Sequence, residues 1–430
     1  MTGVQTLEAR LGLAAIAGVA GVVLSELPLL DRPTAAVFRH SVGAIFLLSR
    51  LSLFGLVFLG LRIAPRGDVP SFYFPEAEAV LRGGLPYRDF TSSYAPLHAY
   101  VDAAVLTVWH SPLALILFAI VAEFVVLCLW LRLGGELFEE HELRVASVLY
   151  LTSAISLQFV GIDGQDNVLI ALLVVTSLWL SMRSRIVFSG VVIAVGALAV
   201  KLIPIFYAPA FFAGVKRRWA WAVGFLAVLL AGYGGFAALR APVLQPLAIE
   251  GPLKSSGTLP YLIESVTGLD LPVQFWNAIM LLILGLVYAA VWRVGSERSG
   301  RSRIVSIVWG TTASTMVLLT FANKSWSPYL MLALFPLCMV VAGLGRSGRI
   351  VFAVFGIIAL AEKSFWATLL AQEEAPELHR TLFGGDPQAI IFLAIQILLL
   401  LGYGWLLRGC VSRLLSEGVD RRAHEPAAVS

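Results

Sequence analysis

The chain has 430 residues, of which 59% are hydrophobic and only 13% are charged, about half of the ~25% that is usual in soluble domains. So few charges cannot cover a water-soluble surface, and they cluster between long apolar runs. This composition excludes soluble enzymes, nucleic-acid-binding modules, disordered chains and disulfide scaffolds. It predicts an all-α polytopic membrane protein whose first partner is the lipid bilayer.

The apolar runs are predicted membrane spans, because about 20 apolar residues cross a hydrocarbon core of about 30 Å. The run from Leu11 to Leu24 predicts a first membrane segment. Later runs predict spans near 41–63, 112–133, 143–159, 167–182, 186–200, 203–214, 218–238, 271–292, 303–321, 328–344, 349–370 and 388–407. We therefore expect one bundle of about 12–13 transmembrane helices over residues 1–415, followed by a flexible cytoplasmic tail at 416–430.

The orientation follows from Lys and Arg, which gather in alternate loops near 183–185, 216–218, 293–303, 346–349 and 408–413. The positive-inside rule predicts that these loops are cytoplasmic. The loops 162–167, 239–270, 321–327 and 372–388 then face outward, as does the long first loop at about 65–111. Segment 97–109 would rise only about 20 Å as a helix, so we expect it, like 72–83, to lie at the outer surface.

Polar side chains are dense in the outward loops and sparse in the spans, which favours chemistry at the outer face. Asp68 follows a span, in a turn with Gly67 and Pro70. A carboxylate held there can act as a general base, and the alternative is a solvated loop acid. Glu123 is the only acid that we expect well inside a span.

The segment at 161–173 places four polar residues between two hydrophobic helices: Asp163, Gln165, Asp166 and Asn167. These amides and carboxylates predict a hydrogen-bonding lip that suits sugar hydroxyls or an acceptor head group. The alternative is a turn in which Asp or Asn caps the following helix.

Two lysines are candidate partners for a lipid phosphate. Lys201 ends an apolar stretch, and a lysine at membrane depth usually has a partner, although it can also snorkel to the interface. Lys324 lies in the outward segment FANKSWSPY, where Trp326 could line a sugar or lipid groove or belong to an interfacial aromatic belt. No nucleotide-binding or metal-binding motif is visible, so no metal site is predicted.

The run GDVPSFYFPEAEAVLRGGLPYRDFTSSYAPL, at 67–97, resembles the first outer loop of glycosyltransferase family 87. GQDN at 164–167, and Lys201 followed by Pro204, resemble two later motifs of that family in the same order. Ser93 and Ala95 depart from the family pattern.

The resemblance implies a GT-C-like fold and an inverting hexosyltransferase of the cell membrane, with its active site facing outward. The donor would be a polyprenyl-phosphate sugar, often mannose, so a substrate takes the place of a cofactor and no metal is needed. The acceptor would be a hydroxyl of a glycan or glycolipid. Asp68 would be the general base, while Lys201 and Lys324 would stabilise the leaving phosphate. The sugar or acceptor would be bound by the residues of the lip, by Trp326, and by Tyr73, Tyr87, Asp89 and Tyr94.

Two other functions remain open at this stage. A polytopic transporter or lipid flippase would need ionisable residues inside the spans and inverted repeats. A non-enzymatic scaffold, or a member of the fold that has lost activity, would bind a polyprenyl phosphate without turnover.

Overall fold

The computed structural model describes residues 3–297, 300–370 and 374–416, which form helices and no strands. Eight of the helices in these residues are long and apolar enough to cross a membrane, which confirms a polytopic membrane protein. They are α1 (Gly3–Ser25), α2 (Ala35–Phe54, continued by η2, Gly55–Gly60), α5 (Pro112–Leu137), α10 (Arg218–Ala238), α13 (Val273–Glu297), α14 (Arg301–Phe321), α16 (Gly345–Thr368) and α18 (Pro387–Ser416).

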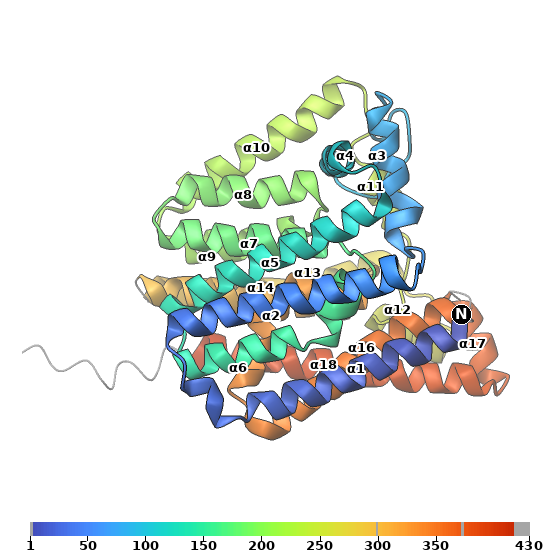
Figure 1. Cartoon of the computed structure of the whole chain (residues 1–430). Coiled ribbons are helices and arrows are strands. Elements are labelled where there is room, and N and C mark those ends of the chain that lie inside the picture. The colour runs from blue at the N-terminus through green and yellow to red at the C-terminus, as the bar shows by residue number, and fades with distance from the viewer. Residues whose placement is uncertain (1–2, 298–299, 371–373, 417–430) are drawn as a thin grey trace, which may run out of the picture.

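Shorter helices occupy the remaining predicted spans and run beside the long ones (Figure 1). They are α6 (Glu140–Leu151) with η4 (Ser156–Val160), α7 (Asn167–Met182), α8 (Ile186–Ala199), η5 (Ile203–Phe206) with α9 (Ala208–Gly214), and η6 (Ser327–Leu332) with α15 (Leu334–Ala342). The predicted first membrane segment lies within α1. The predicted tail lies outside the described residues after Ser416.

The bundle has two different ends. One, which we call the loop end, carries η3 (Val69–Tyr73), α3 (Phe74–Leu81), α4 (His98–Val108), α11 (Gln245–Glu250), α12 (Leu259–Thr267) and α17 (Ala375–Phe383). The opposite end, which we call the basic end, carries the predicted Lys- and Arg-rich loops and η1 (Pro28–Asp31). The prediction that these basic loops share one side of the bundle is confirmed.

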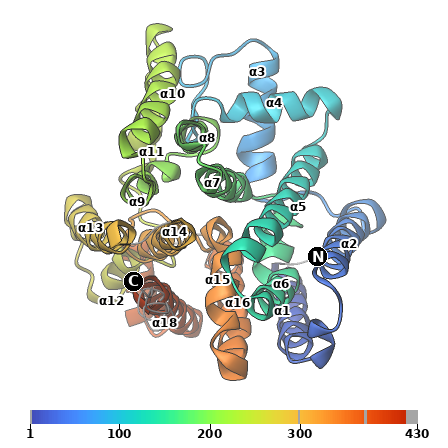
Figure 2. The ribbon, with the colours of Figure 1, turned by 90° about the vertical axis from the view of Figure 1, so that its left-hand side faces the viewer.

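The two predicted surface helices of the first long loop are present. Helix α3 has Pro75 in its first turn and is followed by Gly83, whose φ of +87° stops it. Helix α4 is seen end-on in Figure 1 and lengthwise in Figure 2, so it lies across the end of the bundle. Helix α5 then begins at Pro112, where the Ser111 hydroxyl accepts from the Leu113 N–H.

Close backbone contacts join the helices in the interior. A Cβ on Gly190 in α8 would lie 2.2 Å from the Trp221 carbonyl of α10, and a Cβ on Gly224 in α10 would lie 2.3 Å from the Val187 carbonyl of α8. This use of small residues is typical of helix packing in membranes. Helix α14 is buried over most of its length and occupies the interior of the bundle (Figure 2).

Large apolar side chains cover the outside of the bundle. Leu48, Leu230, Leu282 and Leu401, on four of the long helices, are each between 65% and 70% exposed. An aqueous surface would not carry so many, whereas a hydrocarbon environment favours them. The bilayer therefore remains the expected solvent for this surface.

Glu123 is not the only acid that is fully buried among the helices of the described residues. Glu362 in α16 is as fully buried as Glu123 in α5, and its carboxylate accepts from the hydroxyls of Ser256 and Ser327. Arg50 in α2 is also fully buried, and it donates to the Ser156 hydroxyl, which in turn donates to Glu123. Hydroxyl partners let these charged groups remain in the interior.

Candidate functional site

A continuous chain of polar side chains lies at the loop end. The Gln165 amide donates to the Asp68 carboxylate at 2.9 Å, and the Asn167 amide donates to the Gln165 carbonyl at 3.3 Å. The Lys201 ammonium donates to the Asn167 carbonyl at 3.3 Å and to the Asp166 carboxylate at 2.6 Å. The three sequence features that pointed to chemistry are therefore joined in one network.

Asp166 is the centre of charge in this network. Its second carboxylate oxygen lies 3.1 Å from Nε2 of His98, and Nδ1 of His98 lies 3.6 Å from Asp102. Burial opposes ionisation of Asp166, but Lys201 and His98 outweigh it, so its pKa is lowered well below the usual range. Burial raises the pKa of Asp102 to about 6, although His98 acts against this rise.

Gly164 explains how the turn before α7 reaches Asp68. Its φ is +64°, and a Cβ there would lie 2.8 Å from Ile116 and 2.9 Å from Val69. Glycine therefore allows the turn to pack between α5 and the residue that follows Asp68. This close packing places the Gln165 side chain next to the aspartate.

The first loop also fixes the position of Lys201. The N–H of Ala95 donates to the Val200 carbonyl at 3.2 Å, and the N–H of Leu97 donates to the Leu198 carbonyl at 2.8 Å. These bonds hold the loop against the end of α8. As a result, the Lys201 ammonium lies 5.2 Å from the centre of the Tyr94 ring.

Aromatic rings form one wall of the site. The Tyr94 ring stacks on His98 with a centroid separation of 4.4 Å, and the Tyr73 ring meets both at steep angles. Tyr329 from η6 approaches Lys201 from another side, with 5.3 Å between the ammonium and the ring centre. The wall joins the first loop to a segment more than 200 positions later in the chain.

Two further lysines lie within electrostatic range of Asp68, namely Lys324 and Lys363. Lys324 forms an ion pair with Glu250 of α11. The Lys363 ammonium lies 3.6 Å from the centre of the Trp326 ring and 4.9 Å from that of Trp366. Within the described residues no carboxylate forms an ion pair with Lys363.

Three of the predicted site residues make their contacts outside the network. Asp163 is held by two bonds from Arg10 of α1, at 2.6 and 3.0 Å. The Tyr87 hydroxyl donates to the carbonyl of Tyr94 and so shapes the loop. The exposed Asp89 accepts from Arg88 and from the Leu85 N–H, which gives it a local turn-forming role.

Sequence reasoning missed several residues of the site. His98 was visible in the first loop, but its position between two aspartates depends on how α4 crosses the bundle. Lys363, Glu250 and Arg10 come from segments far from Asp68 in the chain, and local patterns carry no signal of that proximity. Lys363 and Trp366 are three positions apart, so on a helix they lie on one face. This spacing was the only sign in the sequence of a contact between the ammonium and an aromatic ring.

The described residues contain no group of three or more His, Cys, Asp or Glu side chains arranged to hold a metal ion. The chain matches no family model, no curated protein and no solved structure. The functional conclusion therefore depends on the geometry of the site and on the sequence motifs.

Proposed function

We propose that the protein is a membrane glycosyltransferase of the GT-C type, which moves a sugar from a polyprenyl-phosphate donor to an acceptor hydroxyl at the outer membrane face. One observation carries the proposal. The Asp68 carboxylate lies at the loop end of a membrane bundle, is oriented by an amide, and has three lysines within electrostatic range. A carboxylate there can take a proton from the acceptor hydroxyl, and nearby lysines can stabilise the negative charge that develops on a leaving phosphate.

In the proposed reaction Asp68 accepts the proton of the acceptor hydroxyl as that oxygen bonds to the anomeric carbon. The bond between this carbon and the phosphate oxygen breaks, and the electron pair leaves with the polyprenyl phosphate. Attack from the face opposite to the leaving group inverts the anomeric carbon. The acceptor loses a proton, the sugar is transferred from the phosphate oxygen to the acceptor oxygen, and no oxidant or nucleotide is needed.

The lysines divide into two kinds in this mechanism. Lys201 and Lys324 already have carboxylate partners, Asp166 and Glu250, which hold their ammonium groups in place. Lys363 stands over two tryptophan rings without an ion-pair partner among the described residues. Lys363 is therefore the first contact for the donor phosphate, and the other two add positive potential around the growing charge.

The test compares Asp68→Asn with Asp89→Asn in purified protein that is given a polyprenyl-phosphate mannose and a glycolipid acceptor. General-base catalysis contributes about 10²–10⁴-fold, so we expect a loss of that size in kcat for Asp68→Asn. Asp89→Asn, a carboxylate of the same loop bonded to Arg88, keeps activity near that of the natural protein. Full activity in a folded Asp68→Asn variant rules out the assigned role.

A second test concerns the side of the membrane. Ser71 lies close to Asp68 in sequence, Ser347 lies near the start of α16 at the basic end, and both are exposed. An impermeant maleimide applied to intact cells should label Ser71→Cys and should leave Ser347→Cys unlabelled until the membrane is opened. The reverse pattern would place the site on the cytoplasmic side and remove the proposed reaction.

Transport is the alternative that the buried charges favour. Arg50 and Glu123 are the observation behind it, but the Ser156 hydroxyl accepts from Arg50 and donates to Glu123, so the two charges are linked to each other within the bundle. Buried charges inside membrane bundles usually pair with one another in this way. Movement of a labelled polyprenyl phosphate across liposomes without sugar transfer would support a flippase, and transfer without movement supports the enzyme.

A further inference from the structure

A cavity of about 730 Å³ lies at the basic end, at the opposite end of the bundle from the candidate active site. It is formed where the ends of α5, α7 and α9 meet the starts of α8 and α14. Its volume lies in the range of small-molecule binding sites, about 300–1,000 Å³. Nothing in the proposed reaction uses this cavity.

The charge on its walls is strongly unequal. Four basic side chains line it, namely Lys216, Arg217, Arg301 and Arg303, against one acid, Glu136. Glu136 is already bound by Arg183 at 2.7 Å. The cavity therefore presents a positive surface that an anion would satisfy.

The positive-inside rule explains why basic residues occur at this end, but it does not explain their grouping here. Other basic residues of the same end have carboxylate partners: Arg413 pairs with Glu142, and Arg349 pairs with Glu26, at 2.8 and 2.7 Å. Arg218 is engaged as well, with its guanidinium 3.5 Å from the centre of the Trp292 ring.

Three of the cavity residues differ from these. Lys216, Arg217 and Arg301 form no ion pair with any carboxylate in the described part of the chain. Lys216 and Arg217 are consecutive residues of the turn between α9 and α10, and Arg301 opens α14. Basic groups without an ion pair, from the turn before α10 and from the first residue of α14, therefore line the same cavity.

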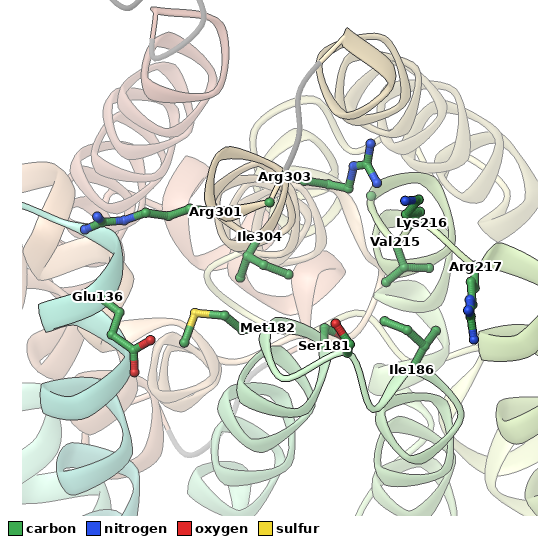
Figure 3. A pocket seen from close by; sticks show the side chains of 13 residues that line it. Glu136, Ser181, Met182, Ile186, Val215, Lys216, Arg217, Arg301, Arg303 and Ile304 are labelled. Carbon is green, nitrogen blue, oxygen red and sulfur yellow. The ribbon is translucent and has the colours of Figure 1, made fainter.

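Apolar side chains and two serines, Ser181 and Ser184, form the rest of the wall. Figure 3 shows Met182, Ile186, Val215 and Ile304 lying between the basic side chains. The neighbouring first turns of α8 and α10 carry Phe188 and Trp219, which are 61% and 78% exposed. Exposed aromatics at a helix end are typical of the headgroup level of a bilayer.

We infer that this cavity binds the phosphate headgroup of an anionic phospholipid. Basic cavities between transmembrane helices at the membrane surface bind such headgroups. Each Lys or Arg strengthens the binding constant by about tenfold or less. The basic groups take the phosphate, while the apolar wall and the aromatic residues at the mouth contact the glycerol and the upper acyl chains. A soluble phosphate would use the same cations but would gain nothing from the apolar wall.

The experiment titrates phosphatidylglycerol, and separately phosphatidylcholine, into the full chain in a neutral detergent and follows the melting temperature. We expect phosphatidylglycerol to stabilise the protein and phosphatidylcholine to have little effect. The triple variant Lys216→Gln, Arg217→Gln, Arg301→Gln should need about a hundredfold more phosphatidylglycerol for the same stabilisation.

A second triple variant controls for total charge: Arg39→Gln, Arg346→Gln, Arg408→Gln. These three arginines are exposed and lie outside the cavity lining. Their substitution removes the same number of positive charges as the cavity variant does. The control should respond to phosphatidylglycerol like the natural protein. An equal loss in both triple variants would mean unspecific attraction and would overturn the site.

Two arms identify the source of the phosphate. Inorganic phosphate that stabilises the protein as well as phosphatidylglycerol does would overturn the lipid assignment. If the cavity variant does not fold, a salt series on the natural protein decides, because headgroup binding by surface cations must weaken as ionic strength rises. Stabilisation by phosphatidylglycerol that persists unchanged in high salt contradicts the inference.

Discussion

The ion pair between Lys201 and Asp166 offers the sharpest test of the network. The side chains are 12% and 6% exposed, and the two charged atoms lie 2.6 Å apart. Removal of one partner from a buried pair costs about 3–5 kcal/mol, because the remaining charge is left without compensation. We therefore expect Lys201→Met to lower the free energy of unfolding by about that amount, because the contact of Asp166 with His98 does not replace the lost ammonium.

The double variant Lys201→Met, Asp166→Asn removes both charges. It should be more stable than the sum of the two single losses by about 2–3 kcal/mol, which is the upper range of measured couplings. Unfolding in mixed micelles of rising denaturant content measures all four proteins of the cycle. The exposed pair Arg88 and Asp89 is the matched control, for which a cycle should give a much smaller coupling because solvent screens the two charges. Additive losses at Lys201 and Asp166 would refute the view that this pair is coupled.

Three more outcomes are expected from the same measurements. Burial raises the pKa of Glu76 to about 7, so the folded protein loses stability relative to the unfolded chain as pH rises from about 4.5 through 7. The introduced glutamine does not ionise, so the free energy of unfolding of Glu76→Gln minus that of the natural protein should rise by about 3 kcal/mol between pH 5 and 8. A difference that does not change with pH contradicts this. Gly190→Ala should prevent close packing of α8 and α10 and cost more than 3 kcal/mol, whereas Gly235→Ala, with open space at its Cβ, should be neutral or slightly stabilising in a thermal melt. Arg10→Gln should cost about 2 kcal/mol because Asp163 loses two charge-assisted bonds; no change in the unfolding midpoint would mean that α1 is held by other contacts.

The membrane helices were predictable because a bilayer requires long apolar runs. The predicted spans agree with the observed helices to within several residues at most edges, and α3 and α4 follow the Pro and Gly signals of the first loop. The shorter predicted spans also coincide with helices, although these are shorter than the eight that could cross a membrane. Their shortness has a structural reason, since α9 and α15 are each preceded by a 3₁₀ turn with a proline near its start.

The convergence of Asp68, Gln165 and Lys201 was a hypothesis that depended on topology, and the hydrogen bonds among them agree with it. The roles of Lys324 and Trp326 were less predictable. Their partners, Glu250 and Lys363, come from other loops and helices, and hydropathy gives no information on such pairs. For Asp89 the motif position indicated a site residue, whereas its contacts in the structure are those of a local turn, so its binding role stays a prediction.

The hydrogen bonds that fasten the first loop to the end of α8 have a consequence for how the protein is made. All links from Asp68 to Lys201 lie within residues 68–201, so this part of the network can close while the remainder of the chain is still being synthesised. Lys324 and Lys363 join only when the later helices have entered the membrane. The groups assigned to proton transfer are thus assembled early in biosynthesis, and the full positive charge around them is completed last.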